Sequence, residues 1–180
     1  MVLKQERKGL EKKFYEIATK VIAETDFVLY DLDYNNGGKT LRVFIMDPKT
    51  NTAVIDDCVA VDRGFTPFME EADWIPDDIV LEVSSPGMFR SLNTIEHFKM
   101  AGSTPITLNL KKTLGDILEG SELDKKTAKA KTFVCNIEEV NEDNLVVALD
   151  EEFSLKINYI DIKKANLEPD AQAANRQEGE

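Results

Sequence analysis

The loop Ser84-Ser85-Pro86-Gly87 constrains the fold more than any other feature, because it separates two regions with different hydrophobic patterns. Before the loop, apolar residues recur at helical spacing over 3–24 and again from Asp56 onward. Three further segments before it alternate as β-strands do, 27–34, 40–46 and 78–84. After a short helical segment, 93–100, the chain consists of short strand-like segments from Thr104 onward. Two small domains of different class are therefore predicted.

The first region predicts an α/β domain over residues 1–90, with two helices on one face of a three-stranded sheet. Its second helix is expected to begin near Asp56, whose carboxylate can accept hydrogen bonds from the first-turn N–H groups. Gly64 and Pro67 lie inside this helix and are expected to weaken or kink it, by roughly 1 and 3 kcal/mol respectively. The expected buried stripe of this helix consists of Cys58, Val61, Phe65, Phe68, Met69 and Ala72.

Strict alternation in the segment 27–34 places Tyr30 and Leu32 on one face of the strand. The same alternation places Asp31 and Asp33 on the opposite face. The turn residues that follow, Asn35 to Gly38, predict a hairpin to the next strand.

The second region predicts a small β-barrel domain over residues 91–168, an architecture that protects strand edges by closure. Its expected strands are 106–110, 133–140, 145–149 and 153–157. An unusually long polar connection, 111–131, lies between the first two of them. Residues 169–180 are rich in Ala, Gln and Glu and are expected to form a disordered tail. The predicted fold class is therefore α+β, an α/β domain followed by a small barrel.

The distribution of charge narrows the possible partners. The chain has 34 acidic and 22 basic side chains, a net charge of −12, which disfavours non-specific binding to a phosphate backbone. Acids gather in 54–82, with nine acids and one base, and in 138–152, with seven acids and no base. Each acidic surface is either a solvated face or a face that attracts a basic partner and speeds its docking. A basic protein fits such a face better than a polyanion does.

Composition also bounds the setting of the protein. No apolar run approaches the roughly 20 residues that a membrane-spanning helix needs, so no membrane association is expected. Cys58 and Cys135 stand far apart and in no metal-ligand spacing, which is typical of reduced thiols in the cytoplasm. We expect a cytoplasmic monomer without a metal ion or cofactor.

The sequence gives little support to an interpretation of the protein as an enzyme. His97 is the only histidine, and we expect it to be a surface or helix-packing residue. Cys58 has no histidine in a recognisable relation to it, so a buried apolar role is favoured over a nucleophilic one. Asp56 and Asp57 could form an acid/base pair or a metal site, yet helix capping explains at least one of them. No catalytic residue is assigned.

The loop at Ser84, Ser85 and Gly87 is open to two interpretations. It is either a plain turn or a shaped loop that sets the angle between domains or offers its hydroxyl and backbone groups to a partner. Arg90, just beyond it, could reach a phosphate or a carboxylate.

This part of the sequence resembles a known family. Leu81-Glu82-Val83-Ser84-Ser85-Pro86-Gly87, followed by Arg90 and Leu92, is similar to the signature segment of the ribosome maturation factor RimP family. Three further stretches resemble the family too, namely 28–45, 55–63 and 162–167. The chain departs from the family pattern at Phe89 and Ser91, where an acidic residue and a proline usually flank the arginine.

The resemblance implies an SH3-like (Sm-like) barrel after the α/β domain. It also implies a non-enzymatic assembly factor that binds the free small (30S) ribosomal subunit and helps a basic ribosomal protein to settle near the decoding region. In the family, the barrel is thought to contact that protein, small-subunit protein number twelve, and the α/β domain to face the ribosomal RNA. The expected binding residues are Ser84, Ser85, Gly87 and Arg90 at the junction and Glu138, Glu139, Glu142 and Asp143 on the barrel.

A stand-alone RNA-binding module built on an Sm-like barrel is the alternative. Six lysines between Lys111 and Lys131 offer the positive charge for it. Such a module also needs aromatic residues interleaved with the bases, and this segment contains none.

Overall fold

A computed structural model describes residues 3, 6–118, 124–150 and 153–169 of the chain. The described residues form two compact units, one of residues 6–87 and one of residue 3 together with 88–169. The domain limits 1–90 and 91–168 stay predictions, and the tail predicted over 169–180 lies outside the described residues except for Pro169. No helix in the described ranges has the length and apolar character that crossing a membrane requires.

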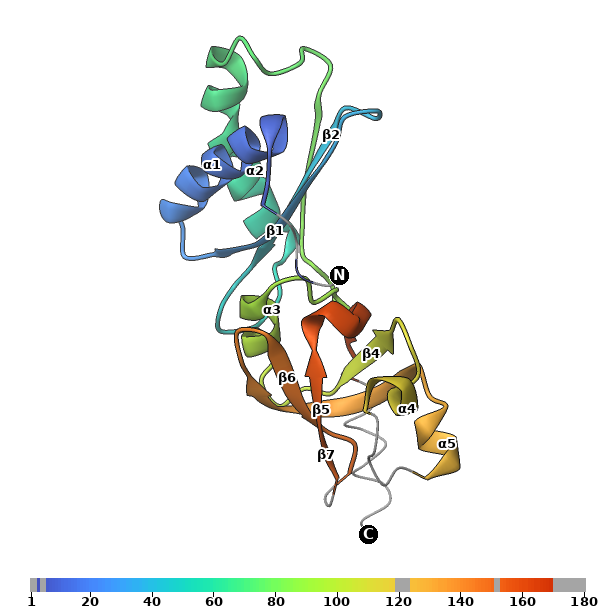
Figure 1. The fold of residues 1–180 in the computed structure, drawn as a ribbon. Coiled ribbons are helices and arrows are strands. Elements are labelled where there is room, and N and C mark those ends of the chain that lie inside the picture. The colour runs from blue at the N-terminus through green and yellow to red at the C-terminus, as the bar shows by residue number, and fades with distance from the viewer. Residues whose placement is uncertain (1–2, 4–5, 119–123, 151–152, 170–180) are drawn as a thin grey trace. The chain divides into compact units, whose positions relative to one another are not determined.

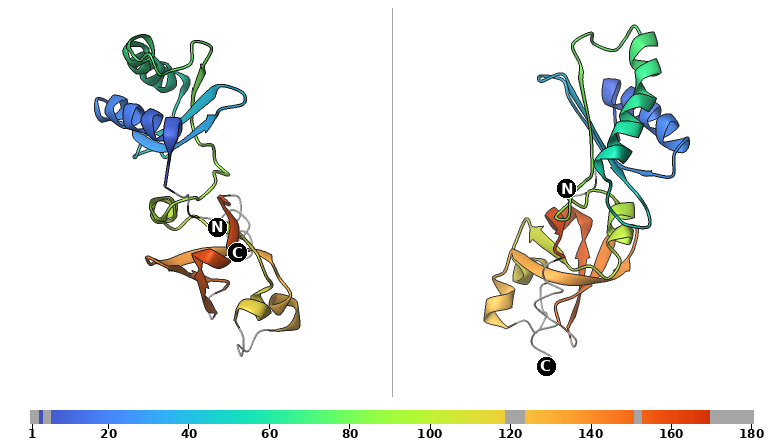
Figure 2. Two further views of the ribbon diagram at one scale, coloured as in Figure 1. Left: turned by 45° about the horizontal axis from the view of Figure 1, so that its top comes forward. Right: turned by 180° about the vertical axis from the view of Figure 1, so that it is seen from behind.

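The first unit has two helices and a three-stranded sheet in the order β1-β2-β3. Its elements are α1 (Gly9–Ala23), β1 (Val28–Asn35), β2 (Thr40–Met46), α2 (Ile55–Glu71) and β3 (Val80–Ser84). The first two strands are antiparallel, whereas β3 runs parallel to β2. Both helices lie on the same face of the sheet (Figures 1 and 2). The core between the two layers includes Phe14, Leu32, Leu41, Val43, Ile45, Val61 and Phe65, all fully buried.

The first helix is shorter than the apolar spacing predicted. It begins at Gly9 and not near Leu3, because Lys8 has an extended backbone and Gly9 itself has a φ of +57°. Residues 6–8 therefore leave the helix, and this frees Arg7 to pack against β1. Arg7 donates to the carbonyl oxygen of Leu32 at 2.8 Å and to the Asp31 carboxylate at 2.8 Å.

A β-bulge explains why strict alternation fails in β1. Leu29 pairs with Ile45 and Asp31 pairs with Phe44, so Tyr30 is an extra residue between two successive pairs. Tyr30, Asp31 and Leu32 are consequently all buried, and Asp31 is only 9% exposed. The buried carboxylate is satisfied by Arg7 and by the backbone N–H of Leu32, 2.8 Å from its Oδ1 atom.

The second helix continues through both residues that were expected to disturb it. It extends four residues past Pro67, to Glu71. At Gly64 a Cβ atom would lie 2.7 Å from Cγ1 of Val21, so this glycine permits close packing of α2 on α1. The expected cap at Asp56 was wrong: the helix begins one residue earlier, and Asp57 accepts from the N–H of Val54 at 2.9 Å.

The second unit is built on a five-stranded antiparallel sheet in the order β7-β6-β5-β4-β8. Its strands are β4 (Ile106–Leu110), β5 (Thr132–Val140), β6 (Asn144–Ala148), β7 (Ser154–Asn158) and β8 (Ile162–Leu167). Its helices are α3 (Ile95–Ala101), α4 (Leu114–Ile117), α5 (Lys125–Ala128) and a 3-10 turn, η1 (Tyr159–Asp161). One buried cluster forms its core, including Phe98, Ile106, Leu108, Leu145, Val147, Ile157 and Ile162.

A mixed α+β chain with helices and two sheets is confirmed, while the closed SH3-like barrel stays a prediction. In the described part of the chain, no strand pairing joins β7 to β8. Thr94 caps α3, because its side-chain oxygen accepts from the N–H of His97 at 3.1 Å. His97 is buried, 3% exposed, and its Nδ1 accepts from the N–H of Asn93.

Candidate functional site

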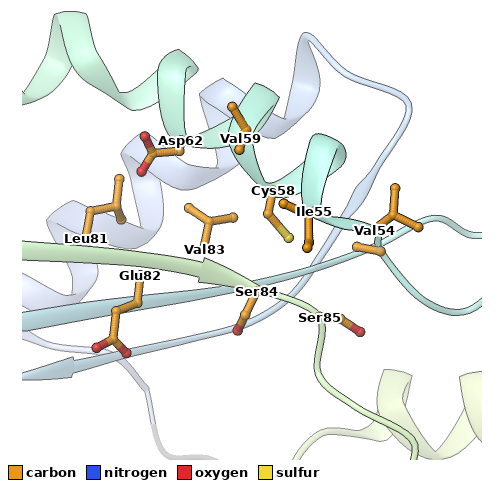
Figure 3. Close-up of a pocket in the computed structure, with 11 residues that line it drawn as sticks. Val54, Ile55, Cys58, Val59, Asp62, Leu81, Glu82, Val83, Ser84 and Ser85 are labelled. Carbon is orange, nitrogen blue, oxygen red and sulfur yellow. The ribbon is translucent and has the colours of Figure 1, made fainter.

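Two of the predicted site residues, Ser84 and Ser85, line an open groove of about 560 Å³ in the first unit. We call it the α2–β3 groove, because its walls come from the first two turns of α2 and from β3 (Figure 3). Ser84 is the last residue of β3 and pairs in register with Phe44 of β2. The residues lining the groove are Ala53, Val54, Ile55, Cys58, Val59, Asp62, Leu81, Glu82, Val83, Ser84 and Ser85.

The loop that follows β3 is a turn stabilised by its own side chains. The Ser85 hydroxyl lies 3.4 Å from the Thr52 hydroxyl and accepts from the N–H of Gly87 at 3.4 Å. Gly87 has a φ of +77°, a conformation that a residue with a Cβ atom adopts only under strain. The sequence therefore fixes the loop's shape, and the two serines stand at one end of the groove.

Apolar side chains exposed to solvent dominate the helical wall of this groove. Ile55 is 81% exposed, Val54 60% and Val59 41%. On α2 they form a stripe separate from Val61 and Phe65, which face the core. The predicted buried stripe of α2 does not include Ile55 or Val59, although the helical spacing of these two residues in the sequence is the signal for a second apolar stripe.

Arg90 belongs to the second unit, whereas Ser84, Ser85 and Gly87 belong to the first. Its carbonyl oxygen accepts from the N–H of Leu167 in β8 at 3.0 Å. The four residues predicted at the junction are thus divided between two units, and the groove contains only two of them.

The four acidic residues predicted on the second unit are all exposed. Glu138 and Glu139 are in β5, and Glu142 and Asp143 are in the turn to β6; we call them the acidic hairpin. A bulge in β5 pairs Ile137 with Val147 and Glu139 with Val146, which leaves Glu138 as the extra residue. Tyr159 anchors the turn, because its hydroxyl donates to the Asn141 carbonyl at 2.9 Å. Among the described residues, none of these four acids has an ion pair with a basic side chain.

The thiols are poorly suited to nucleophilic chemistry. Burial, together with the nearby Asp57 carboxylate, raises the pKa of Cys58 above its ordinary value. Burial raises the pKa of Cys135 to about 12. Both groups are therefore thiols and not thiolates at neutral pH. The described residues hold no group of three or more His, Cys, Asp or Glu side chains that could bind a metal ion.

The sequence of the first unit matches a known protein family. Residues 17–89 match the family model described as the RimP N-terminal domain. The matched region includes the second half of α1, the whole three-stranded sheet, α2 and the Ser84–Gly87 loop, so it contains the entire α2–β3 groove. The resemblance drawn from the loop and the family match thus rest on the same unit, and both support the RimP family of ribosome maturation factors.

Proposed function

We propose that this protein is a non-enzymatic, cytoplasmic assembly factor that binds the free small (30S) ribosomal subunit and promotes its maturation. The observation that carries this proposal is the RimP N-terminal domain over residues 17–89, which ends on the signature segment of the family. The proposed partners are small-subunit ribosomal protein number twelve and ribosomal RNA within the assembling particle. The protein acts as a monomer and uses no cofactor.

The division of labour between the two units follows from their surfaces. The second unit, which we propose to be SH3-like because its five antiparallel strands share a single buried core, presents the acidic hairpin to the basic ribosomal protein. An acidic surface attracts a basic protein over roughly 10 Å at moderate salt and raises its association rate. Ser84, Ser85, Gly87 and Arg90 are the proposed contacts near the junction.

Co-sedimentation of the purified chain with free 30S subunits tests the proposal. We expect the protein to sediment with free small subunits at moderate salt and to remain in the supernatant with large subunits. Absence from the small-subunit pellet at all salt concentrations would refute the proposed function.

A second experiment tests the acidic hairpin. The variant Glu138→Gln/Glu139→Gln/Glu142→Gln/Asp143→Asn should bind the isolated basic ribosomal protein with a lower association rate and a flatter salt dependence. The matched control neutralises acids of the first unit, Glu70→Gln/Glu71→Gln/Asp73→Asn/Asp77→Asn, and should leave that association rate unchanged. Equal association rates for wild type and hairpin variant would remove the hairpin from the proposal.

A stand-alone RNA-binding module predicts a different result. It would bind naked single-stranded RNA tightly and with a steep salt slope. Measuring that affinity beside the affinity for 30S subunits separates the two functions.

A further inference from the structure

The two edge strands of the three-stranded sheet, β1 and β3, differ in the hydrogen bonding of their outward backbone groups. At the β1 edge, side chains satisfy the outward backbone groups of Leu32: its carbonyl oxygen accepts from Arg7 at 2.8 Å, and its N–H donates to Asp31 at 2.8 Å. Such blocking is how proteins protect exposed strand edges from pairing with other chains. The edge beside β1 is therefore closed to an additional strand.

The β3 edge has no such protection. The N–H of Val80 donates to the Lys39 carbonyl at 2.8 Å, so Val80 directs its backbone groups toward β2. Backbone groups alternate in direction along a parallel strand, and those of Leu81 and Val83 therefore point away from β2. In the described part of the chain, neither a strand nor a side chain bonds to these outward groups. A row of unpaired donors and acceptors is a template for another strand.

The α2–β3 groove lies beside this open edge. Leu81 and Val83 point toward α2, whereas Glu82 and Ser84 point to the opposite face of the sheet (Figure 3). A strand added next to β3 would alternate in the same way. Side chains on its helical face would meet Ile55 and Val59, both exposed, and those on its other face would lie near Glu82.

Charge defines the kind of strand that fits. The stretch 54–82 holds nine acids and only one base, Arg63. Asp62 lines the helical side of the groove and has no ion pair among the described residues, while Glu82 is paired with Arg42 at 2.7 Å. A second copy of this chain would bring an equally acidic edge, and a nucleic acid would bring phosphates, so both are repelled. A basic segment is attracted.

We propose that the open edge of β3 binds an extended, basic segment of a partner protein, which adds as a fourth strand by β-augmentation. Apolar side chains of the segment enter the α2–β3 groove, and the alternate basic side chains lie beside Glu82 on the opposite face of the sheet. Main-chain hydrogen bonds to Leu81 and Val83 supply affinity, and the groove supplies specificity. This interaction surface goes beyond the proposed function, because it stands on the geometry of the groove alone.

Binding of a model peptide to the full chain tests the proposal. The probe is a fluorescein-labelled peptide of alternating valine and lysine, followed by anisotropy. We expect saturable binding that weakens with salt. A peptide with glutamate in place of lysine, and one with a central proline that removes a strand hydrogen bond, should each bind at least about tenfold more weakly.

Variants of the protein locate the binding site. Ile55→Ser/Val59→Ser should weaken binding about tenfold, because it removes the apolar wall that the segment covers. Both positions are exposed, so the fold is retained. The matched control is Val134→Ser, which alters a valine of similar exposure (44%) on β5 and should leave the affinity unchanged. Asp62→Asn should have a smaller effect, two- to threefold by order of magnitude, and should reduce the salt dependence.

Amide hydrogen exchange by NMR identifies the binding mode. The peptide should slow exchange at Leu81 and Val83, whereas Val80, already bonded to Lys39, serves as the internal reference. Absence of binding, unchanged affinity in the Ile55→Ser/Val59→Ser variant, or binding without protection of those two amides would each overturn the proposal. So would a dimer of the free protein that the same variant dissociates. Co-sedimentation with 30S subunits is a separate measurement, so a negative result for peptide binding to the groove does not contradict the proposed function.

Discussion

Both units present clustered acids, but on different backgrounds. In the first unit the acids border exposed apolar residues, Ile55 and Val59, beside an open strand edge. In the second unit the acidic hairpin projects from a sheet whose inward-facing apolar residues form one buried cluster. The second surface can attract a basic partner without desolvating it, whereas the first can also bury part of it. The charge of each surface thus selects the sign of the partner's charge, and the exposed apolar side chains beside it decide how tightly the partner is bound.

The strongest test of this comparison asks whether the two cores are separate. Phe65→Ala in the first core and Leu108→Ala in the second should each lower the free energy of unfolding of its own unit by about 3 to 5 and 2 to 5 kcal/mol, respectively. Trp74, the only tryptophan, packs against the first core and reports on it by fluorescence. In urea unfolding, the midpoint followed by Trp74 fluorescence should move to lower urea in the Phe65 variant and stay unchanged in the Leu108 variant. In the Leu108 variant, the midpoint followed by circular dichroism should move to lower urea instead. A fluorescence shift with Leu108→Ala would mean that the cores are coupled.

The next test concerns the protected β1 edge. Asp31→Ala removes one of the two carboxylates that pair with the Arg7 guanidinium, the other being Glu11, and should lower the free energy of unfolding by about 2 kcal/mol. Asp33→Ala, on the exposed face of the same strand, is the control and should change it by less than about 0.5 kcal/mol. Urea titration monitored by Trp74 fluorescence measures both. Equal effects would show that the Arg7–Asp31 pair contributes nothing beyond a surface charge.

Alkaline pH should distinguish the second unit from the first. Burial raises the pKa of Cys135 from 9.0 to about 12, and burial with the nearby Glu96 carboxylate raises that of Tyr159 from 10.0 to about 12. Between pH 9 and 12 the unfolded thiol releases its proton while the folded thiol keeps it. Stability therefore falls with rising pH, by about 1.4 kcal/mol per pH unit for Cys135.

Circular dichroism during urea unfolding at pH 8 and pH 10 measures this loss. Cys135→Ala should flatten the pH dependence without abolishing it, because Tyr159 still titrates. An identical pH dependence in wild type and variant would contradict the assignment to Cys135.

The smallest expected effect concerns the contact between α1 and α2. Gly64→Ala gains roughly 1 kcal/mol of helix propensity but places a methyl group 2.7 Å from Cγ1 of the branched Val21 side chain. We expect a net loss of about 1 kcal/mol in Trp74-monitored urea unfolding. Gly37→Ala, at a turn where the nearest atom is 3.5 Å away, is the control and should be close to neutral. A gain in stability with Gly64→Ala would show that the helices can separate at little cost.

The order of elements in the first unit and most of the core could be predicted from the sequence, because burial imposes a period of 3.6 on helices and of 2 on strands. Val61 and Phe65 on α2 are examples. The short helices α4 and α5, which lie within the stretch 111–131, were not predicted. The bulge at Tyr30 could not, since periodicity assumes that every strand residue pairs with one partner. The groove escaped prediction for another reason. Ile55 and Val59 obey helical spacing, but only the tertiary structure shows that nothing in the described chain covers them. Whether the second unit closes into a barrel stays a prediction.

The two bulges have a common consequence for how such a chain can evolve. In a regular strand, successive side chains point alternately into the core and into solvent. Inserting one residue therefore moves every following side chain to the opposite face. The extra residue at Tyr30 brings a carboxylate inward, where it guards an edge, and the extra residue at Glu138 sets two acids side by side in solvent. Each bulge therefore absorbs one additional residue, so that surface residues at the bulge can change during evolution while the paired residues of the strand keep their register.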